Sequence, residues 1–532
     1  MDKFMDSLAG INDVINNFVW VKVGLVLLLG TGVLMTVLTK FFQVSHFGHW
    51  MKETIGKMFK KDSHAKGKNS ISQFQALCTA LAATVGVGNI AGVADAIVVG
   101  GPGAVFWMWL AAFFGMMTNY SENVLGIYFR RRNKKGEWSG GAMYYLQDGL
   151  GGYTYKDKNA TISFKKFGKV LAVLFSIFCL LASFGIGNMG QVDKIVTNIE
   201  SAFNIEALSS HVLYSAGNES VTLYSVVIGI VLVILAALII LGGLKRIAAF
   251  AEKVVPFMVV AFVAGSLVII AINFSHIGAA FKAIFVSAFN PQAVFGAATG
   301  VVVKEAITAG FKRGVFSNEA GLGSSVMVHS NSNVKEPVKQ GMWGIFEVFA
   351  DTMIVCTMTA LVVLTSGVYD LNAGKLVDET MSGSTLVAEA FNKIFTFGNV
   401  KIGGMFIALA ILLFAFTTVL GWSHYGSKAW EYLFGTKTTV VYKVFFVAMI
   451  ISGALMTSSL AWDISDTFNG LMMIPNLIGV IAMSGLVVKI TRNYVDRKFR
   501  KKDIKPMLSF DESIQSEQEA ELVIEEAAAS AK

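Results

Sequence analysis

The stretch TVGVGNIAG at residues 84–92 lies in the middle of a long apolar run and decides how the chain is interpreted. Each glycine lowers the stability of a helix by about 1 kcal/mol, so three glycines this close together favour a helix that opens. An opened helix in a membrane exposes carbonyl groups at the end of one half and amide N–H groups at the start of the next, which suit a cation and an anion. Close helix packing is the alternative role for these glycines. A dinucleotide-binding loop would require a βαβ context and a different glycine spacing.

The chain around this stretch is too apolar for a soluble protein. Of its 532 residues, 54% are hydrophobic and 15% are charged, whereas soluble domains carry about 25% charged residues. A membrane-spanning helix needs about 20 apolar residues, and the sequence predicts an all-α polytopic membrane protein with eleven transmembrane helices. These spans lie at 18–42, 73–99, 104–129, 168–190, 221–242, 248–272, 293–311, 340–366, 402–425, 440–458 and 470–489.

The distribution of basic residues supports the doubtful seventh span, which contains Lys304 and Glu305. With eleven crossings, 36 Lys and Arg residues fall in the connections on one side of the membrane and 5 on the other. Without the seventh crossing, the two sides hold 21 and 20. Because cytoplasmic connections accumulate Lys and Arg, we expect the N-terminus outside and the C-terminus in the cytoplasm, in the plasma (inner) membrane. The basic clusters at 130–132 and 497–502 then set the topology, and binding of nucleic acid is not expected.

A second glycine-containing segment, FGAATG at 295–300, interrupts the seventh span. Interrupted spans at matching places in two halves indicate an inverted-repeat transporter with its site between the repeats. The first span stands outside these repeats. The predicted organisation is an extracellular N-terminus and extra first helix at 1–42, a basic cytoplasmic connection at 43–72, a first five-helix repeat at 73–273, a second at 274–490, and a disordered or weakly helical cytoplasmic tail at 491–532.

Several motifs resemble those of the alanine or glycine:cation symporter family, the sodium:alanine symporters. The longest is GGPGAVFWMWLAAFFG at 100–115, and the others are GVGN at 86–89, WSGGAMYY at 138–145, GNMGQ at 187–191, FSNEAGLGS at 316–324 and TTVLGW at 417–422. The resemblance covers roughly residues 70–490. It implies a LeuT-type core of 5+5 helices, a small neutral amino acid as substrate, Na⁺ or sometimes H⁺ as coupling ion, no other cofactor, and membrane lipid as the surroundings.

Alanine and glycine are zwitterions, so their site must hold a carboxylate and an ammonium group. Backbone amides near Gly88 and Asn89 suit the carboxylate, because they would start a half-helix, and the Asn89 side chain adds a donor. Opened carbonyls of the second interruption, at Phe295, Gly296 and Thr299, suit the ammonium.

The resemblance adds three residues to the expected pocket: Gln191, Thr418 and Trp422, the last as a wall that excludes large side chains. Each has a simpler alternative role. A membrane Thr often bonds to a carbonyl one turn back, a Trp near a helix end often anchors the membrane interface, and a Gln at the end of a span can be solvated. By analogy with LeuT-type carriers, we expect Na⁺ between the carbonyls of Ala82 and Val85 and the hydroxyls of Thr417 or Thr418.

The remaining polar residues suggest no rival function. Five acidic residues within spans favour structural pairing or gating over a proton path; they are Asp95, Glu122, Glu305, Glu347 and Asp351. The seven His residues do not cluster, and neither HExxH nor GxSxG occurs, so an enzyme is not expected. A channel would need a repeated filter motif, which is not visible. The alternatives that stay open are an H⁺-coupled carrier of another small zwitterion and a channel.

Overall fold

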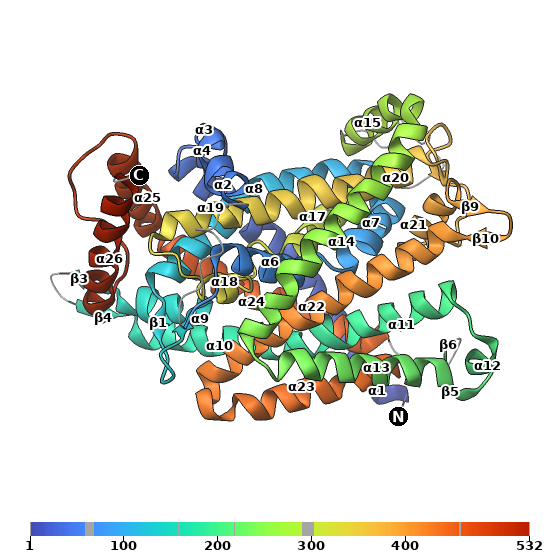
Figure 1. Cartoon of the computed structure of the whole chain (residues 1–532), viewed down its shortest axis with the longest axis horizontal. Coiled ribbons are helices and arrows are strands. Elements are labelled where there is room, and N and C mark those ends of the chain that lie inside the picture. Colours follow the sequence, from blue (N-terminus) through green and yellow to red (C-terminus); the bar gives the residue numbers. More distant parts are fainter. Residues whose placement is uncertain are drawn as a thin grey trace.

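The computed structural model describes residues 2–58, 69–157, 160–216, 219–289, 303–456 and 459–530, and most of this part is helical (Figure 1). Segments labelled η are π-helical or 3₁₀ turns. Up to residue 289 the helices are α1 (Asp2–Asn17), η1 (Phe18–Gly24), α2 (Leu25–Leu38), α3 (Phe42–Ser45), α4 (Phe47–Glu53), α5 (Ile55–Met58), α6 (Gln73–Thr84), η3 (Gly88–Gly92), α7 (Val93–Gly100), α8 (Gly103–Tyr128), α9 (Ala142–Tyr144), η4 (Tyr145–Gly149), η5 (Leu150–Gly152), α10 (Lys165–Phe184), η6 (Gly185–Met189), α11 (Gly190–Ala202), α12 (Glu206–Ser209), α13 (Leu223–Ile240), α14 (Leu244–Ile272) and α15 (Phe274–Phe289). From residue 303 they are α17 (Val303–Asn318), α18 (Val326–His329), α19 (Pro337–Val348), η7 (Phe349–Cys356), α20 (Thr357–Thr365), α21 (Gly383–Asn392), α22 (Ile402–Phe434), η8 (Thr436–Thr438), α23 (Thr439–Ala454), α24 (Ser459–Ala482), α25 (Ser484–Lys498) and α26 (Glu512–Ser530).

The strands in the described part of the chain form short antiparallel hairpins that join the helices. Their pairs are β1 (Arg131–Arg132) with β2 (Trp138–Ser139), β3 (Thr154–Asp157) with β4 (Ala160–Ser163), β5 (Val212–Ala216) with β6 (Glu219–Thr222), β7 (Tyr369–Asp370) with β8 (Lys375–Leu376), and β9 (Thr396–Phe397) with β10 (Val400–Lys401). None of these small pairs builds a core. The core lies between the helices.

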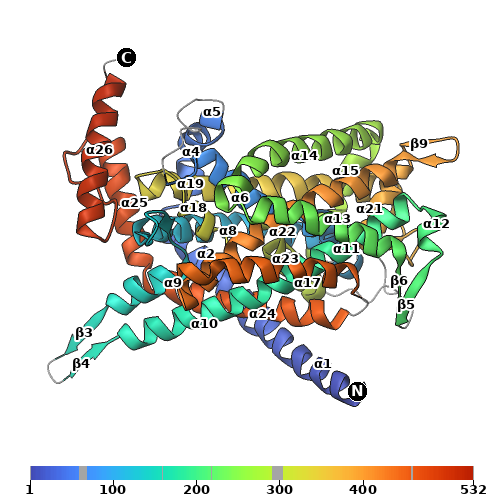
Figure 2. The same cartoon turned by 60° about the horizontal axis from the view of Figure 1, so that its bottom comes forward.

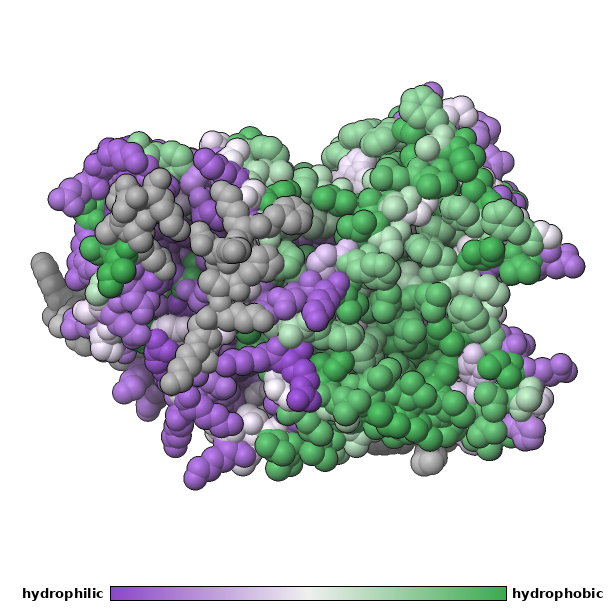
Figure 3. Space-filling view, viewed as in Figure 1, coloured by the Kyte–Doolittle hydropathy of each residue, from purple (hydrophilic) through white to green (hydrophobic). Residues whose placement is uncertain are grey.

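Many of the helices suit a lipid environment. Eight helices in the described ranges are long and apolar enough to cross a membrane, and the bent pair α6 with η3–α7 makes a ninth. Large apolar side chains are exposed along α13, α14 and α23, among them Ile234, Phe257 and Val444. Figure 3 shows hydrophobic side chains gathered over the region where these helices lie, and hydrophilic ones at the end that holds α25 and α26. The predicted helical architecture with apolar spans is confirmed, whereas the number of eleven crossings stays a prediction.

The first predicted interruption is present in the structure. Helix α6 begins with a capping box between Ser72 and Gln75 and ends at Thr84. Val85 leaves the helical region with ψ 87°, and helix continues as η3 and α7 at an angle of 57° to α6. The chain is therefore bent in the middle of the second span, at the glycines that predict it.

A second interruption lies between α17 and α18, where Glu319, Gly321 and Gly323 have positive φ angles. Helix α17 packs against α7, and α18 packs against α6. The backbone just after α18 also bonds with Ile71, just before α6: Ile71 N–H donates to the Asn331 carbonyl at 3.1 Å, and the Asn333 N–H donates to the Ile71 carbonyl at 2.9 Å. The two interrupted helices therefore run side by side in opposite directions.

This arrangement corrects the predicted seventh span. The sequence predicts a helix that ends at 311, but α17 continues to Asn318, seven residues further. The charges in that extension are accommodated because Lys312 pairs with Asp466 at 3.0 Å and Arg313 with Asp95 at 3.6 Å. The predicted interruption at 295–300 lies outside the described residues. The one that the structure describes comes about twenty residues later, inside the FSNEAGLGS motif.

The C-terminal tail, predicted to be disordered or weakly helical, contains helix α26 (Glu512–Ser530) in the structure. Figure 2 shows α26 lying alongside α25 at one end of the molecule, away from β5–β6 and α12 at the other. The side chains of Leu508 and Leu522 are buried, and Glu517 pairs with Arg132 at 2.7 Å. Apolar burial and ion pairs to distant residues hold this helix, and neither can be predicted from the composition of the tail.

Candidate functional site

Asn89 builds the first interruption. Its side-chain oxygen accepts a hydrogen bond from the Gly86 N–H at 2.9 Å, and its side-chain nitrogen donates to Asp351 Oδ1 at 2.7 Å. Its carbonyl accepts from the Thr359 hydroxyl at 2.7 Å. These bonds tie the unwound stretch to η7 and α20. The side-chain amide, expected to bind a carboxylate, is thus occupied by Gly86 and Asp351, so Asn89 shapes the backbone of the site.

A small cavity lies beside this interruption. Its volume of about 20 Å³ exceeds the roughly 10–15 Å³ that one water molecule requires. Five segments that are distant in sequence form its wall: the two interrupted helices, η6 with α11, α22 and α24. The lining residues are Ala83, Thr84, Gly86, Gly88, Ile186, Gln191, Phe316, Glu319, Thr418, Trp422 and Asn469.

The cavity brings together four of the predicted substrate-binding residues: Gly88, Gln191, Thr418 and Trp422. Gly88 is the first residue of η3. The first backbone amides of a helix have no hydrogen-bond partners within that helix. A Cβ atom on Gly88 would lie 3.1 Å from the Phe316 ring, so glycine lets the two interrupted helices approach. The other predicted residues, Phe295, Gly296 and Thr299, lie outside the described part of the chain.

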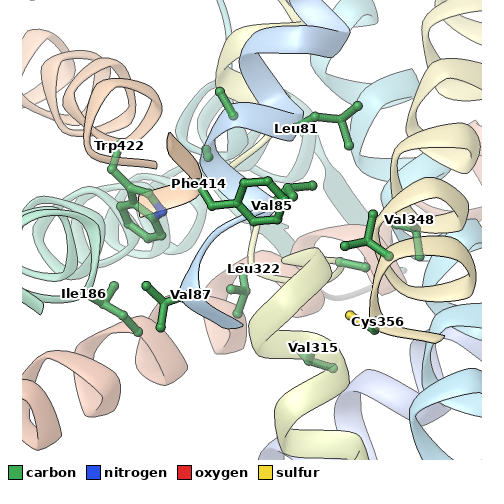
Figure 4. Packing of buried hydrophobic residues seen from close by; sticks show 14 of the residues in the cluster. Leu81, Val85, Val87, Ile186, Val315, Leu322, Val348, Cys356, Phe414 and Trp422 are labelled. Atoms are coloured by element: carbon green, nitrogen blue, oxygen red, sulfur yellow. The ribbon is translucent and has the colours of Figure 1, made fainter. Parts of the chain in front are cut away.

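Trp422 is a buried wall of this cavity and not a membrane-interface anchor. Its side chain is 2% exposed, and its indole N–H donates to Glu319 Oε1 at 2.9 Å. A Cβ atom on Gly187 would come within 2.5 Å of the Trp422 side chain, so the glycine allows α22 to pack on η6. Figure 4 shows Trp422 and Ile186, which come from different helices, near Val87 in the unwound stretch.

Gln191 is also buried, although it follows η6 near the end of the predicted fourth span. Its side-chain nitrogen donates to the Ile186 carbonyl at 3.1 Å. A Cβ atom on Gly86 would lie 3.5 Å from the Gln191 side-chain oxygen and 2.6 Å from the Thr418 hydroxyl oxygen. Both polar groups therefore face the first interruption, and a solvated Gln191 is excluded.

Only part of the predicted cation site converges. The Thr418 hydroxyl lies 3.1 Å from the Ala82 carbonyl, at the end of α6, and 3.0 Å from the Phe414 carbonyl. The Thr417 hydroxyl instead bonds to the Phe414 carbonyl at 2.9 Å and points to Met258 Sδ at 3.7 Å. Thr417 therefore faces α14 and is removed from the predicted ligand set. Ala82 and Thr418 supply the hard oxygen atoms that an alkali cation prefers, and Val85 follows the same helix end.

Asp351 links the two interruptions and is not among the residues that line the cavity. It accepts hydrogen bonds from Asn89, from Ser317 Oγ at 2.6 Å and from Thr352 Oγ1 at 2.9 Å. Ser317 belongs to α17 and Asn89 to η3, so one carboxylate fixes the ends of both interrupted helices. This agrees with the structural pairing predicted for the buried acids, as does the contact of Glu347 with His329 at 2.9 Å.

Glu319 is the site residue that sequence analysis misses. It is 4% exposed, lines the cavity and bonds to Trp422. The signal was present as an acidic residue between an apolar helix and two glycines, in the FSNEAGLGS motif. Sequence analysis overlooks Glu319 because it predicts the second interruption at 295–300 and ends the membrane span at 311. Residue 319 then falls in a connection outside the membrane.

The family model described as the sodium:alanine symporter family matches residues 5–508 of this chain. The chain belongs to the sodium:alanine symporter family. It is 41% identical over 501 residues to the sodium/alanine symporter AgcS of Methanococcus maripaludis, covering 94% of this chain and 100% of that protein. It is 33% identical to the putative sodium/proton-dependent alanine carrier protein YrbD of Bacillus subtilis, covering 93% of each. It is 32% identical to the probable sodium/glutamine symporter GlnT of Bacillus subtilis, covering 94% of this chain and 93% of that protein.

The resemblance inferred from the motifs is thereby confirmed, and this family member is a multi-pass membrane transporter rather than an enzyme. Among solved structures, the chain is similar to MhsT in complex with L-phenylalanine, with a TM-score of 0.49 and 13% identity, over 80% of this chain and 99% of that one.

Proposed function

We propose that this transporter is a secondary active symporter that takes small neutral amino acids, alanine and glycine, into the cell together with Na⁺ by alternating access. The observation that carries the proposal is the cavity of about 20 Å³ at the crossing of two interrupted helices, with Trp422 as its wall. As it stands the cavity holds little more than one water molecule, so it must widen to admit any amino acid. Alanine and glycine require less widening than glutamine, which the name of GlnT specifies for that relative. The name of AgcS, sodium/alanine symporter, agrees with this choice.

The proposed substrate carboxylate lies at the start of η3, near the amides that follow Gly86. Positive helix N-termini attract anions, and Asn89 keeps the stretch unwound through its bond to Gly86. Trp422 limits the space for the side chain, and Gln191 and Thr418 complete the wall.

The proposed Na⁺ site uses the Ala82 carbonyl, the Thr418 hydroxyl and the Val85 carbonyl. Its support is the meeting of the end of α6 with α22, where the Ala82 and Thr418 oxygen atoms lie 3.1 Å apart. Because the Thr418 hydroxyl belongs to both the cavity wall and this pair, binding of the ion and binding of the substrate would stabilise the same helix arrangement.

We also propose eleven crossings: the eight long helices, the bent pair, α8 and the pair α17–α18. Five of these segments run from α6 to α14 and five from α17 to α24, which supports a LeuT-type 5+5 inverted repeat preceded by one helix. The opposite directions of the two interrupted helices support the inversion. In this topology the hydrophilic end with α25 and α26 faces the cytoplasm of a plasma-membrane protein, and the N-terminus lies outside.

Uptake of labelled alanine into proteoliposomes tests the function. We expect saturable uptake driven by an inward Na⁺ gradient, and little uptake when choline replaces Na⁺. Glycine should compete at concentrations similar to alanine, and glutamine should compete weakly. Uptake that follows an H⁺ gradient without Na⁺ would replace the sodium proposal with the H⁺-coupled alternative, and a flux that does not saturate would indicate a channel.

A further inference from the structure

Glu319 is a buried carboxyl group without a cationic partner in the described part of the chain. Trp422 donates to its Oε1 at 2.9 Å and Ser324 Oγ to its Oε2 at 2.5 Å. Within the described residues, no Lys, Arg or His side chain forms an ion pair with Glu319, whereas Asp95 and Asp466 each pair with a basic residue of α17. A buried carboxylate is stable only if it is neutralised or paired. Each of its oxygen atoms can accept further hydrogen bonds beyond those from Trp422 and Ser324.

Two further acceptors line the same cavity. The side-chain oxygens of Gln191 and Asn469 are buried and have no hydrogen-bond partner in the described part of the chain. The nitrogen of Gln191 is held by the Ile186 carbonyl, so its oxygen is the atom that faces the first interruption. Unsatisfied buried acceptors are costly and call for a donor.

The lining of the cavity combines two kinds of polar group. The first interruption contributes backbone amides beside Gly88. Glu319, Gln191 and Asn469 contribute a carboxyl group and two amide oxygens, all of them able to accept hydrogen bonds. A molecule with a carboxylate and an ammonium group on the same carbon atom matches this lining, since its ammonium brings three N–H donors and a positive charge.

We propose that Glu319 is the specificity-determining counter-charge for the substrate ammonium group, assisted by the side-chain oxygens of Gln191 and Asn469. This inference rests on the proposed amino-acid transport and assigns the group that distinguishes an amino acid from the corresponding carboxylic acid. Trp422 then has two tasks, because the indole that limits side-chain size also orients the Glu319 carboxylate. Glu319 has a φ angle of +54°. Asp and Asn adopt positive φ angles more readily than most residues, so Asp is compatible with the backbone at this position.

The test compares alanine with propionate, which is alanine without its amino group, as inhibitors of labelled-alanine binding to the purified full-length protein. For the unmodified protein we expect alanine to bind far more tightly than propionate. In Glu319→Gln, the inhibition constant of alanine should rise about 10- to 100-fold, the loss expected for a charged hydrogen bond. The constant of propionate should stay the same or fall, because its binding no longer leaves a buried charge unpaired.

Ser324→Ala is the matched control, because it removes one hydrogen bond from Glu319 and leaves the charge. It should keep the ratio of the two constants. Equal weakening of alanine and propionate in Glu319→Gln would assign Glu319 a structural role and overturn the inference. An unchanged inhibition constant of alanine in Glu319→Gln would also overturn the inference. If, in addition, the pH dependence of transport changed, Glu319 would be a proton carrier instead of the counter-charge.

If Glu319→Gln does not fold, Glu319→Asp carries the test. A carboxylate withdrawn by one methylene should weaken alanine alone, and proportional weakening of propionate would contradict the proposal. The proposed function fails separately from this inference. If the unmodified protein neither binds nor transports alanine, the proposed function is wrong. If it transports alanine but Glu319→Gln keeps the ratio of the alanine and propionate inhibition constants, only the role of Glu319 is wrong.

Discussion

Gly86→Ala places one methyl group in the site and tests its geometry directly. The Cβ atom would lie 2.6 Å from the Thr418 hydroxyl oxygen and 3.5 Å from the Gln191 side-chain oxygen. Gly86 does not have a positive φ angle, so alanine is acceptable to the backbone and the effect is steric. The Thr418 hydroxyl must move away, although it is held by the carbonyls of Ala82 and Phe414.

The expected cost follows from overpacking a cavity of about 20 Å³. Forcing an extra methyl group into a packed site costs about 1–3 kcal/mol, which corresponds to about 5- to 150-fold weaker binding. Because Thr418 belongs to both proposed sites, the KM for alanine and the Na⁺ concentration for half-maximal uptake should rise together. Glycine, which lacks the substrate methyl group, should lose less affinity than alanine.

The assay is uptake into proteoliposomes at varied alanine and Na⁺ concentrations. Gly30→Ala in α2 is the matched control, because a Cβ atom there has no neighbour within 4 Å, and it should behave like the unmodified protein. If Gly86→Ala kept the alanine KM and the Na⁺ dependence, the cavity beside the first interruption would not be the transport site.

Three further substitutions test other parts of the site and the fold. Thr418→Val should raise the half-saturating Na⁺ concentration about tenfold, which corresponds to a loss of roughly 1.4 kcal/mol in binding. Thr417→Val should leave that concentration unchanged. Equal effects of the two substitutions in the same uptake assay would contradict the assignment of Thr418 as the Na⁺ ligand. Trp422→Ala should let glutamine compete with labelled alanine about tenfold better, because a pocket wall discriminates between substrate sizes by roughly 1–3 kcal/mol. Unchanged competition would show that another group limits the size of the substrate side chain. Arg130→Ala should lower the free energy of unfolding by about 3 kcal/mol, because the buried guanidinium donates to backbone carbonyls after α18. Thermal unfolding in detergent measures this loss. Arg132→Ala, which removes a partly exposed ion pair with Glu517, should cost at most about 1 kcal/mol.

The first interruption could be predicted because its cause is local. Three glycines weaken the helix at the point where it opens, and Asn89, three residues after Gly86, supplies the oxygen that accepts the Gly86 N–H. The partner that fixes Asn89 could not be predicted, since Asp351 lies 262 positions away in the chain. The side-chain amide therefore appeared free to bind substrate, although the fold engages it elsewhere.

The second interruption shows where hydropathy fails. The segment at 295–300 contains glycines within an apolar run, while residues 312–319 contain charges that lower the mean hydropathy. In the structure Lys312 pairs with Asp466 and Arg313 pairs with Asp95, so α17 continues through both residues to Asn318. Because the predicted span ended at 311, Glu319 was not recognised as a residue within the membrane. The packing of the tail helix could not be predicted for a similar reason, because Arg132 and Lys335, which pair with it, come from distant connections.

The sequence by itself indicated the membrane environment, the family, the first interruption and four of the residues that line the cavity, because hydropathy, glycine spacing and contiguous motifs are properties of neighbouring residues. Only the tertiary structure decided that Glu319 faces Trp422, that Thr418 and not Thr417 meets the Ala82 carbonyl, and that Asn89 is held by Asp351. A side chain's direction and partners depend on which helices pack together, and that packing energy is shared among residues hundreds of positions apart.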